Sequence, residues 1–150
     1  MAESLDDGAT WRRLAEIPAR EGDSAKEYHE LHAVETGDGR IVCQIRNHNK
    51  ANPGETLQTE STDGGKTWSV PKAIGVWGLP SHLLRLKDGG LLMSYGHRRK
   101  PFGNQARVSR DQGRTWGELI PISEDGASGD LGYPSTVQLD DSSLVTVWYE

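Results

Sequence analysis

Two short stretches of the sequence contain residue types that bind phosphate or metal ions. Residues 61–68 read STDGGKTW, and the GGKT core has the composition of a phosphate-binding loop. Such a loop needs a glycine five residues before the Gly-Lys-Thr triplet, where this chain has Glu60. We therefore expect no phosphate site at this stretch.

The second stretch, residues 29–32, reads HELH and contains zinc-binding residue types. His29 and His32 are three positions apart, which places them on opposite faces of an extended strand. A zinc site also requires three or four converging ligands. The expectation is that the chain binds neither a metal nor another cofactor.

A third arrangement pairs an acid with an arginine across a predicted hairpin. If residues 37–39 (GDG) form a three-residue loop, Thr36 pairs with Arg40 and Glu30 lies opposite Arg46. Directly opposed residues on antiparallel strands have Cβ atoms about 5 Å apart. The register predicts that Glu30 and Arg46 meet at one end of the hairpin, as site residues or as a cross-strand salt bridge at the rim.

The elements that position these residues follow from a repeat. The pattern S-x-D-x-G-x-T-W occurs at residues 4–11, 61–68 and 109–116, at intervals of about 50 residues. The aspartate can accept backbone N–H groups and the glycine supplies a positive φ, so each octet predicts a turn between strands. Asp6, Asp63 and Asp111 are thus expected to be structural, and the three tryptophans to be apolar plugs.

A second repeat, of β-hairpins, alternates with the octets at residues 30–41, 80–91 and 134–144. With one strand on each side of the octet, every unit has four strands, the content of one propeller blade. The chain then divides into the end of one blade (1–19), two whole blades (28–75 and 79–123) and the start of another (133–150). These blades are too few to close a ring, so we expect a fragment of a longer protein.

Composition agrees with this fold class and excludes several functions. The 150 residues include 18 glycines and 5 tryptophans, which suits a turn-rich all-β protein. A net charge of −5 argues against nucleic acid as a partner. No signal peptide and no membrane-spanning run is recognisable, and localisation is undetermined. The single cysteine, Cys43, lies in an apolar run and is predicted to be a buried thiol.

The octet is identified as the Asp box, and its repetition resembles the BNR repeats of the sialidase (neuraminidase) superfamily. The resemblance implies a six-bladed β-propeller, of which this chain would be a C-terminal part. Residues 30–46 resemble the sialidase segment in which a glutamate assists the nucleophile and an arginine clamps the substrate carboxylate. Glu30 and Arg46 match those positions, whereas His29 stands where the family usually has asparagine.

Residues 132–141 and 147–150 resemble the segment that carries the family's tyrosine nucleophile, which implies this role for Tyr133. Pro134 is a departure from the family pattern. A further clamp arginine is expected near Gly96, which is equivalent to Arg46. Arg98 shares its strand face and is preferred over Arg99 and Arg107.

The resemblance implies an exo-α-sialidase that acts on sialylated glycans by a retaining mechanism. Sialic acid carries a carboxylate at the anomeric carbon, which repels a carboxylate nucleophile but not a neutral phenol. Arginine binds such a carboxylate through its planar, permanently charged fork. The alternative is a non-catalytic Asp-box propeller that binds glycans or serves as a scaffold. Exposed blade edges would allow self-association of the fragment.

Overall fold

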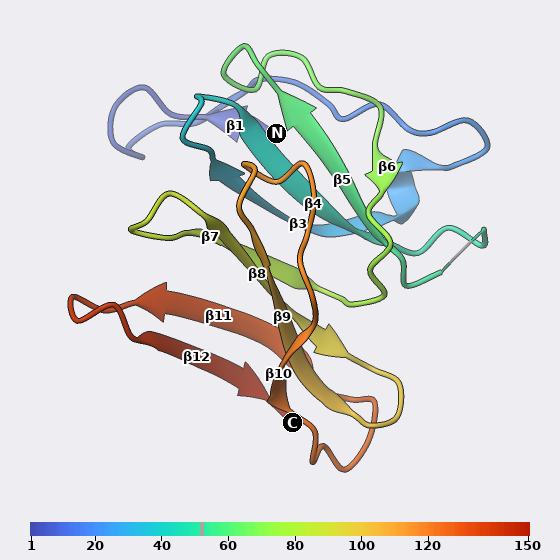
Figure 1. The fold of residues 1–150 in the computed structure, drawn as a ribbon. Coiled ribbons are helices and arrows are strands. Elements are labelled where there is room, and N and C mark those ends of the chain that lie inside the picture. The colour runs from blue at the N-terminus through green and yellow to red at the C-terminus, as the bar shows by residue number, and fades with distance from the viewer. Residues whose placement is uncertain (52) are drawn as a thin grey trace.

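The computed structural model describes residues 1–51 and 53–150, and antiparallel strands dominate them (Figure 1). The strands are β1 (Ala2–Glu3), β2 (Arg12–Arg13), β3 (Tyr28–Glu35), β4 (Ile41–Asn47), β5 (Thr56–Ser61), β6 (Lys72–Ala73), β7 (Ser81–Arg85), β8 (Leu91–His97), β9 (Gly103–Ser109), β10 (Ile120–Ser123), β11 (Gly132–Gln138) and β12 (Leu144–Tyr149). One 3₁₀ turn, η1 (Ala25–Glu27), precedes β3. No helix in the described ranges has the length and apolar character needed to cross a membrane.

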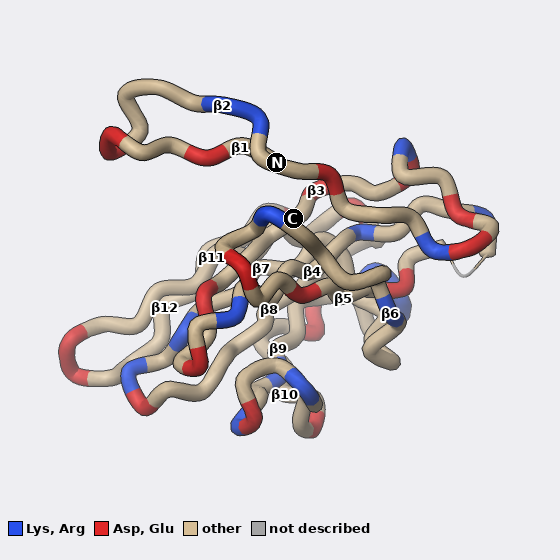
Figure 2. Tube along the Cα trace, turned by 90° about the horizontal axis from the view of Figure 1, so that it is seen from above, with Lys and Arg blue, Asp and Glu red and all other residues tan. Residues whose placement is uncertain are grey.

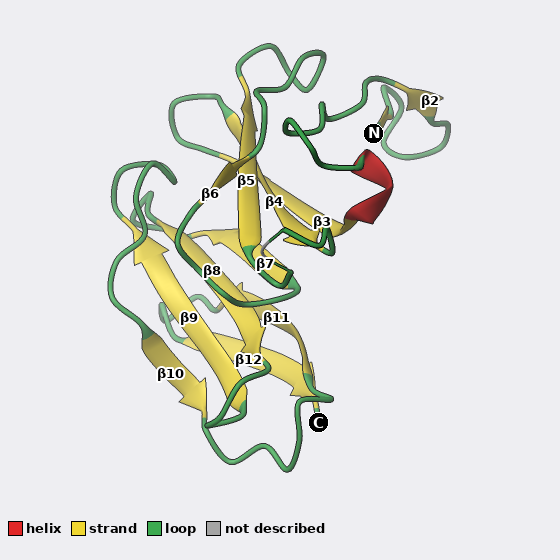
Figure 3. Ribbon diagram, turned by 90° about the vertical axis from the view of Figure 1, so that its right-hand side faces the viewer, coloured by secondary structure: helices red, strands yellow, loops and turns green. Residues whose placement is uncertain are grey.

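The strands form two four-stranded sheets and two two-stranded sheets (Figure 3). The larger sheets have the orders β3-β4-β5-β6 and β7-β8-β9-β10, so each strand pairs with its sequence neighbour. The strands β1-β2 and β11-β12 form the smaller sheets. The prediction of an all-β chain with four-stranded antiparallel sheets is confirmed, and the described sheets do not close into a ring.

The three predicted hairpins share one turn geometry. The amide of Thr36 donates to the Arg40 carbonyl, and the equivalent bonds join Leu86 to Gly90 and Leu139 to Ser143. The first two turns place glycine at positive φ, whereas the third places Ser142 there, at 71°. The turn therefore tolerates a serine at a position that glycine favours.

The octets close the turns through their aspartates. In residues 61–68, Asp63 accepts the backbone amide of Thr67 at 2.9 Å and its hydroxyl at 2.6 Å. The Ser61 hydroxyl donates to Asp63 at 2.8 Å and accepts the Gly65 amide at 2.9 Å. Asp6 and Asp111 have the same serine and threonine partners in their octets.

These hydrogen bonds predict that the fold loses stability when the aspartates are protonated in acid. The threonine hydroxyls lower the pKa of Asp6 and of Asp63 from 3.8 to about 2. Burial raises the pKa of Asp111, but hydrogen bonds from Thr115 outweigh it and the pKa is also about 2. A carboxyl with a depressed folded-state pKa stabilises the fold above its unfolded pKa and loses this effect as protons bind.

We expect the free energy of unfolding to fall between about pH 4 and pH 2, and Asp63→Asn to reduce this slope. Urea titrations at several pH values, followed by tryptophan fluorescence, measure both effects. An identical slope in wild type and Asp63→Asn would contradict the assignment.

The core lies between consecutive sheets. Val42 of β4 packs with Leu83, Met93 and Tyr95 of the next sheet and with Val76, and all of these are buried. The first strands of neighbouring sheets also touch, since β3 contacts β7 and β7 contacts β11. Burial of apolar surface between sheets therefore fixes their relative positions.

Only part of the expectation for the tryptophans holds. Trp116 is partly buried against this core, and its indole donates to Gln58 of the preceding sheet at 3.0 Å. Trp68 is also partly buried. Trp11 is 66% exposed, so its predicted role as a plug is wrong: in the described chain, β1 and β2 form a sheet of two strands with little surface to cover it.

Charges of both signs are mixed along the chain, and the single cysteine is buried. Figure 2 shows acidic and basic residues interspersed along the chain. Cys43 is 2% exposed, and burial raises the pKa of its thiol to about 12. The thiol is therefore protonated and unreactive at neutral pH, as a buried structural cysteine should be.

Candidate functional site

The candidate residues gather where the first strands of the hairpins begin and the second strands end. Glu30 lies near the start of β3 and Arg46 near the end of β4. Tyr133 is the second residue of β11, and Arg98 directly follows β8. Antiparallel pairing within hairpins and contact between β3, β7 and β11 bring these positions to one end of the sheets. We call Glu30, Arg46, Arg98 and Tyr133 the tyrosine–glutamate site.

The site centres on three side chains in direct contact. The Tyr133 hydroxyl donates a hydrogen bond to one Glu30 carboxylate oxygen, and Arg46 binds the other at 2.6 Å. Arg46 Nη1 also lies 3.2 Å from the Tyr133 hydroxyl. Residues 103 positions apart in sequence thus meet in one hydrogen-bonded group.

The predicted register of Glu30 is wrong, although its contact with Arg46 exists. Arg46 pairs with His29, and the register shifts between His29 and His32. This irregularity holds Glu30, with a φ of 43°. A bulge bends the strand and re-aims the side chain, so Glu30 reaches Arg46 from a position that is not opposite to it.

Tyr133 occupies a similar irregularity. The register of β11 against β12 shifts between Gly132 and Ser135, and Tyr133 has a φ of 54°. Positive φ costs free energy in a non-glycine residue and is frequent where a side chain must be held for function. The two bulges therefore aim the acid and the phenol at each other.

Close backbone contact supports the bulge at Tyr133. A Cβ on Gly96 would lie 2.9 Å from the Cα of Gly132 and 3.0 Å from the Leu79 carbonyl oxygen. The end of β8 can approach β11 this closely only because Gly96 lacks a side chain. A side chain at this position, such as that of Arg46 in the preceding hairpin, would collide with this backbone.

Glu30 is ionised at neutral pH. Burial raises its pKa, but hydrogen bonds from Tyr133 and Arg46 outweigh burial, so the net pKa lies below the ordinary value of 4.5. The ionised carboxylate accepts the phenolic proton and can act as its base. Arg46, whose side chain is 14% exposed, provides the balancing positive charge.

The three arginine candidates near Gly96 differ in their surroundings. The Arg98 guanidinium lies 5.9 Å from the centroid of the Tyr133 ring. Arg99 instead stacks on Trp77 at 4.2 Å, and Arg107 bonds to Gly117 at 2.6 Å. Within the described residues, Arg98 Nε is buried and has no hydrogen-bond partner. Of the three candidates, Arg98 is the one beside the site.

Tyr149 and Asp130 border the site. No role for Asp130 was predicted from the sequence. The ring centroids of Tyr133 and Tyr149 are 5.8 Å apart. The Tyr149 hydroxyl donates to Asp130 at 2.6 Å, and this bond raises the Tyr149 pKa. Asp130 lies in a loop, where no strand pattern could signal its position.

Two hollows flank the tyrosine–glutamate site. One, of about 240 Å³, is lined by Glu30, Leu31, His32, Pro80, Ser81, His82, Tyr133 and Pro134. The other, of about 120 Å³, is lined by Pro53, Gly54, Trp77, Gly78, Leu79, Gly96, Arg98 and Arg99. The first hollow therefore gives access to Tyr133 and Glu30, and the second to Arg98.

Two histidines form a wall of the larger hollow. The rings of His32 and His82 are 4.4 Å apart, and burial lowers the pKa of both. His32 Nδ1 accepts the Leu83 amide at 3.1 Å, and His82 Nδ1 accepts the Thr136 amide at 3.4 Å. Each histidine thus ties one inner strand to the next as a neutral acceptor.

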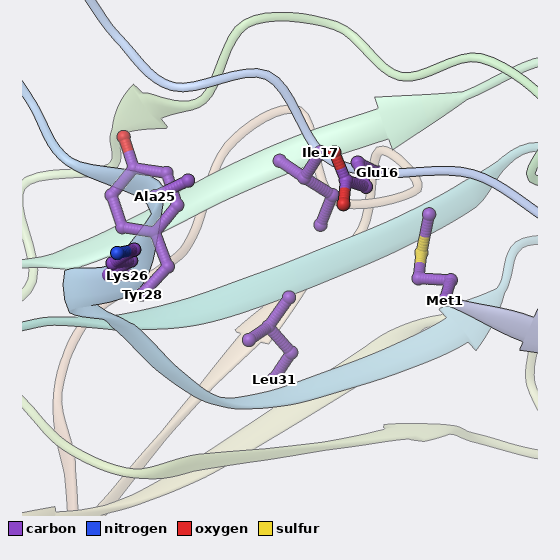
Figure 4. Close-up of a pocket in the computed structure, with 7 residues that line it drawn as sticks. All are labelled: Met1, Glu16, Ile17, Ala25, Lys26, Tyr28 and Leu31. Atoms are coloured by element: carbon purple, nitrogen blue, oxygen red, sulfur yellow. The ribbon is translucent and has the colours of Figure 1, made fainter.

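A separate hollow of about 330 Å³ lies between the N-terminal segment and β3 (Figure 4). Figure 4 shows the side chains of Ile17 and Leu31 pointing toward one another, with Met1 nearby. This lining is mostly apolar and lacks a converging set of polar groups. It has no evident part in the chemistry of the tyrosine–glutamate site.

One group in the described part of the chain has the residue types and spacing for a metal ion. It consists of Glu27, His29 and His48, whose ligand atoms lie within 4.8 Å of one another. His32, the other half of the HELH stretch, is not part of it. His48 lies beside His29 only because β3 and β4 pair in a hairpin. The spacing of the histidines along the sequence therefore does not predict this group.

Comparisons with known proteins agree with this architecture. The model of the BNR repeat-like domain matches residues 1–146. A crystal structure of a protein of unknown function from Dyadobacter fermentans is 34% identical, with a TM-score of 0.87, over 99% of this chain and 40% of that one. No curated protein matches the sequence.

More distant structures share the fold. A Hadza microbial sialidase is 15% identical with a TM-score of 0.57, over 99% of this chain and 39% of its own. An α-L-arabinofuranosidase of Fusarium graminearum, solved with arabinobiose, is 18% identical with a TM-score of 0.61, over 91% and 49% of the two chains. The chain thus spans less than half the length of each of these structures.

The relationship that the repeated octets predicted is confirmed. The family model covers nearly the whole sequence, and the Dyadobacter protein exceeds 30% identity over almost all of it. The chain belongs to the BNR repeat-like domain family.

Proposed function

We propose that the chain is part of a six-bladed β-propeller glycoside hydrolase that removes terminal sialic acid from glycoconjugates. The observation that carries this proposal is the contact of Tyr133, Glu30 and Arg46 at the meeting point of two bulged strands. A phenol bonded to an ionised carboxylate is an activated nucleophile. Two arginines, Arg46 and Arg98, lie beside it, which suits a substrate that is itself an anion.

In the proposed reaction, Glu30 takes the proton of Tyr133 as the phenolic oxygen attacks the anomeric carbon. The bond to the leaving-group oxygen breaks, and that oxygen takes a proton from an acid outside the four residues of the site. The product of this step is a glycosyl-tyrosine. Water then attacks the same carbon and gives a proton to the group that acted as the acid in the first step, while Tyr133 leaves and recovers its proton from Glu30. Two inversions at one carbon give net retention.

Arg46 and Arg98 would hold the substrate carboxylate. Arg46 already contacts the nucleophile and its base, and Arg98 lies over the ring of Tyr133. Their Nε atoms are buried and lack hydrogen-bond partners among the described residues, so a bound anion could satisfy them. Arg46 is already paired with Glu30, so a neutral arabinose would leave Arg98 without a matching anion, which favours an acidic sugar.

The test is hydrolysis by the full-length protein of a fluorogenic α-sialoside and of a fluorogenic α-L-arabinofuranoside. We expect fluorophore release from the sialoside and little or none from the arabinoside. Release from the arabinoside alone would overturn the substrate assignment. Glycan binding without hydrolysis of any glycoside would favour the non-catalytic propeller.

A further inference from the structure

A second cluster of polar side chains lies at the same end of the β3-β4 hairpin but outside the tyrosine–glutamate site. It contains Glu27 at the end of η1, His29 on β3 and His48 just after β4. Each offers one ligand atom, and all three atoms lie within 4.8 Å of one another. All three residues are exposed, so an ion can reach them from solvent. We call this group the Glu27–His29–His48 cluster.

Backbone pairing holds the three residues together. The His48 amide donates to the Glu27 carbonyl at 2.9 Å, which extends the pairing of β3 with β4 by one position. His29 pairs with Arg46, so His48 is its diagonal neighbour two residues on. Diagonal neighbours on adjacent strands share a face and lie within reach of each other. The imidazole rings of His29 and His48 are accordingly 4.5 Å apart.

The ligand set specifies a class of ion. Two imidazoles and one carboxylate suit Zn²⁺ and related divalent transition metals, whereas Ca²⁺ and Mg²⁺ prefer oxygen ligands alone. Ligands of a tetrahedral zinc lie about 3.3 Å apart, given metal–ligand distances near 2.0 Å. Small rotations of three exposed side chains would close the present spacing to that value.

The ligand atoms are available for a metal. Within the described residues, neither imidazole and no Glu27 oxygen makes a hydrogen bond or ion pair with a side chain. No side chain of the described residues therefore competes with a metal for the three groups.

Beside the cluster lies a hollow of about 380 Å³ with room for further ligands. It is lined by Gly22, Asp23, Ser24, Glu27, His48, Asn49, Lys50 and Ala51. Asn49 accepts the Ser24 amide at 2.8 Å and donates to the Ser24 carbonyl at 3.3 Å, which fixes one wall. A metal with three protein ligands keeps an open position, and this hollow can hold the water or small ligand that fills it.

We infer that Glu27, His29 and His48 form a binding site for a zinc-like divalent transition metal ion, with at least one open coordination position. The inference is independent of the sialidase proposal, since none of the three residues belongs to the tyrosine–glutamate site. The ion would nevertheless lie close to that site, because His29 precedes Glu30 and pairs with Arg46.

The test is calorimetric titration of the metal-free, full-length protein with Zn²⁺, repeated with Co²⁺ and visible absorption spectroscopy. We expect His29→Gln and His48→Gln each to weaken the affinity of one Zn²⁺ per chain by at least about 10-fold, since each removes one of three ligands. Mg²⁺ should not compete. The cobalt complex should show an absorption band that either substitution weakens.

His97→Gln is the matched control, because it removes an imidazole outside the cluster and should leave zinc affinity unchanged. Circular dichroism of each variant establishes that the fold is retained. Wild-type zinc affinity in folded His29→Gln and His48→Gln would overturn the inference. An equal loss of affinity in His97→Gln would also overturn it, as would the absence of a zinc-binding event in wild type.

Discussion

Replacement of Tyr133 by phenylalanine is expected to reduce the kcat for sialoside hydrolysis by the full-length protein at least about 1,000-fold. Removal of a covalent nucleophile ranks among the largest effects of single substitutions in enzymes. The change deletes one oxygen and keeps the ring beside Arg98 and Tyr149. Steady-state assays with a fluorogenic sialoside measure kcat, and KM should change much less because both arginines remain.

Tyr149→Phe is the control for this prediction. It removes the same atom from the neighbouring ring, but that hydroxyl bonds to Asp130 and not to Glu30. We expect less than about a 10-fold change in kcat, because no proton of the proposed reaction passes through it. Unchanged turnover in Tyr133→Phe would remove this residue from the nucleophile role.

Replacement of Met93 by alanine is expected to lower the free energy of unfolding by about 2–5 kcal/mol. Met93 has no exposed surface and lies in the core between the two four-stranded sheets. Its sulfur also accepts a long contact, 3.6 Å, from the side-chain amide of buried Gln44. Truncation would leave a cavity at the sheet interface, and the Gln44 side-chain amide would lose its contact with the sulfur.

Urea titration followed by tryptophan fluorescence measures this loss as a lower midpoint at a similar slope. Met93→Leu, which nearly conserves volume, should cost less than about 1.5 kcal/mol. Val70→Ala is a surface control, because Val70 is 59% exposed and its truncation should change stability by less than about 0.5 kcal/mol. A loss in Met93→Ala no larger than in Val70→Ala would mean that this interface contributes little to the fold.

Much of the fold could be predicted because its signals are local and repeated. Each octet carries its own turn: the aspartate, the glycine and the threonine that close it lie within seven residues. Each hairpin turn is likewise closed by residues four apart. Such contacts depend on residue type and short spacing, which a single sequence displays.

The sequence indicated which residues belong to the candidate site, but it did not predict how they are arranged. Counting outward from the turn of residues 37–39 placed Glu30 opposite Arg46, and the bulge between His29 and His32 invalidates that count. A bulge adds one residue to a single strand, and no residue type in HELH announces it. The side chains still meet, because the bulge turns Glu30 toward both Arg46 and Tyr133.

The choice among the three arginines shows the same limit. Strand alternation favoured Arg98, but Arg99 and Arg107 were also candidates in the same stretch. Only the packing of other segments separates them, since Trp77 takes up Arg99 and the Gly117 carbonyl takes up Arg107. Those partners come from loops whose paths the local sequence does not specify.

The sequence by itself determined the all-β class, the turns at Asp6, Asp63 and Asp111, the hairpins and the family, because each rests on short-range patterns that recur. Only the tertiary structure decided how Glu30, Arg46, Arg98 and Tyr133 contact one another, and that His48 joins Glu27 and His29. These contacts join residues from different hairpins, or the two ends of one hairpin. Their geometry depends on bulges and on the packing of one sheet against the next, which involve the whole chain at once.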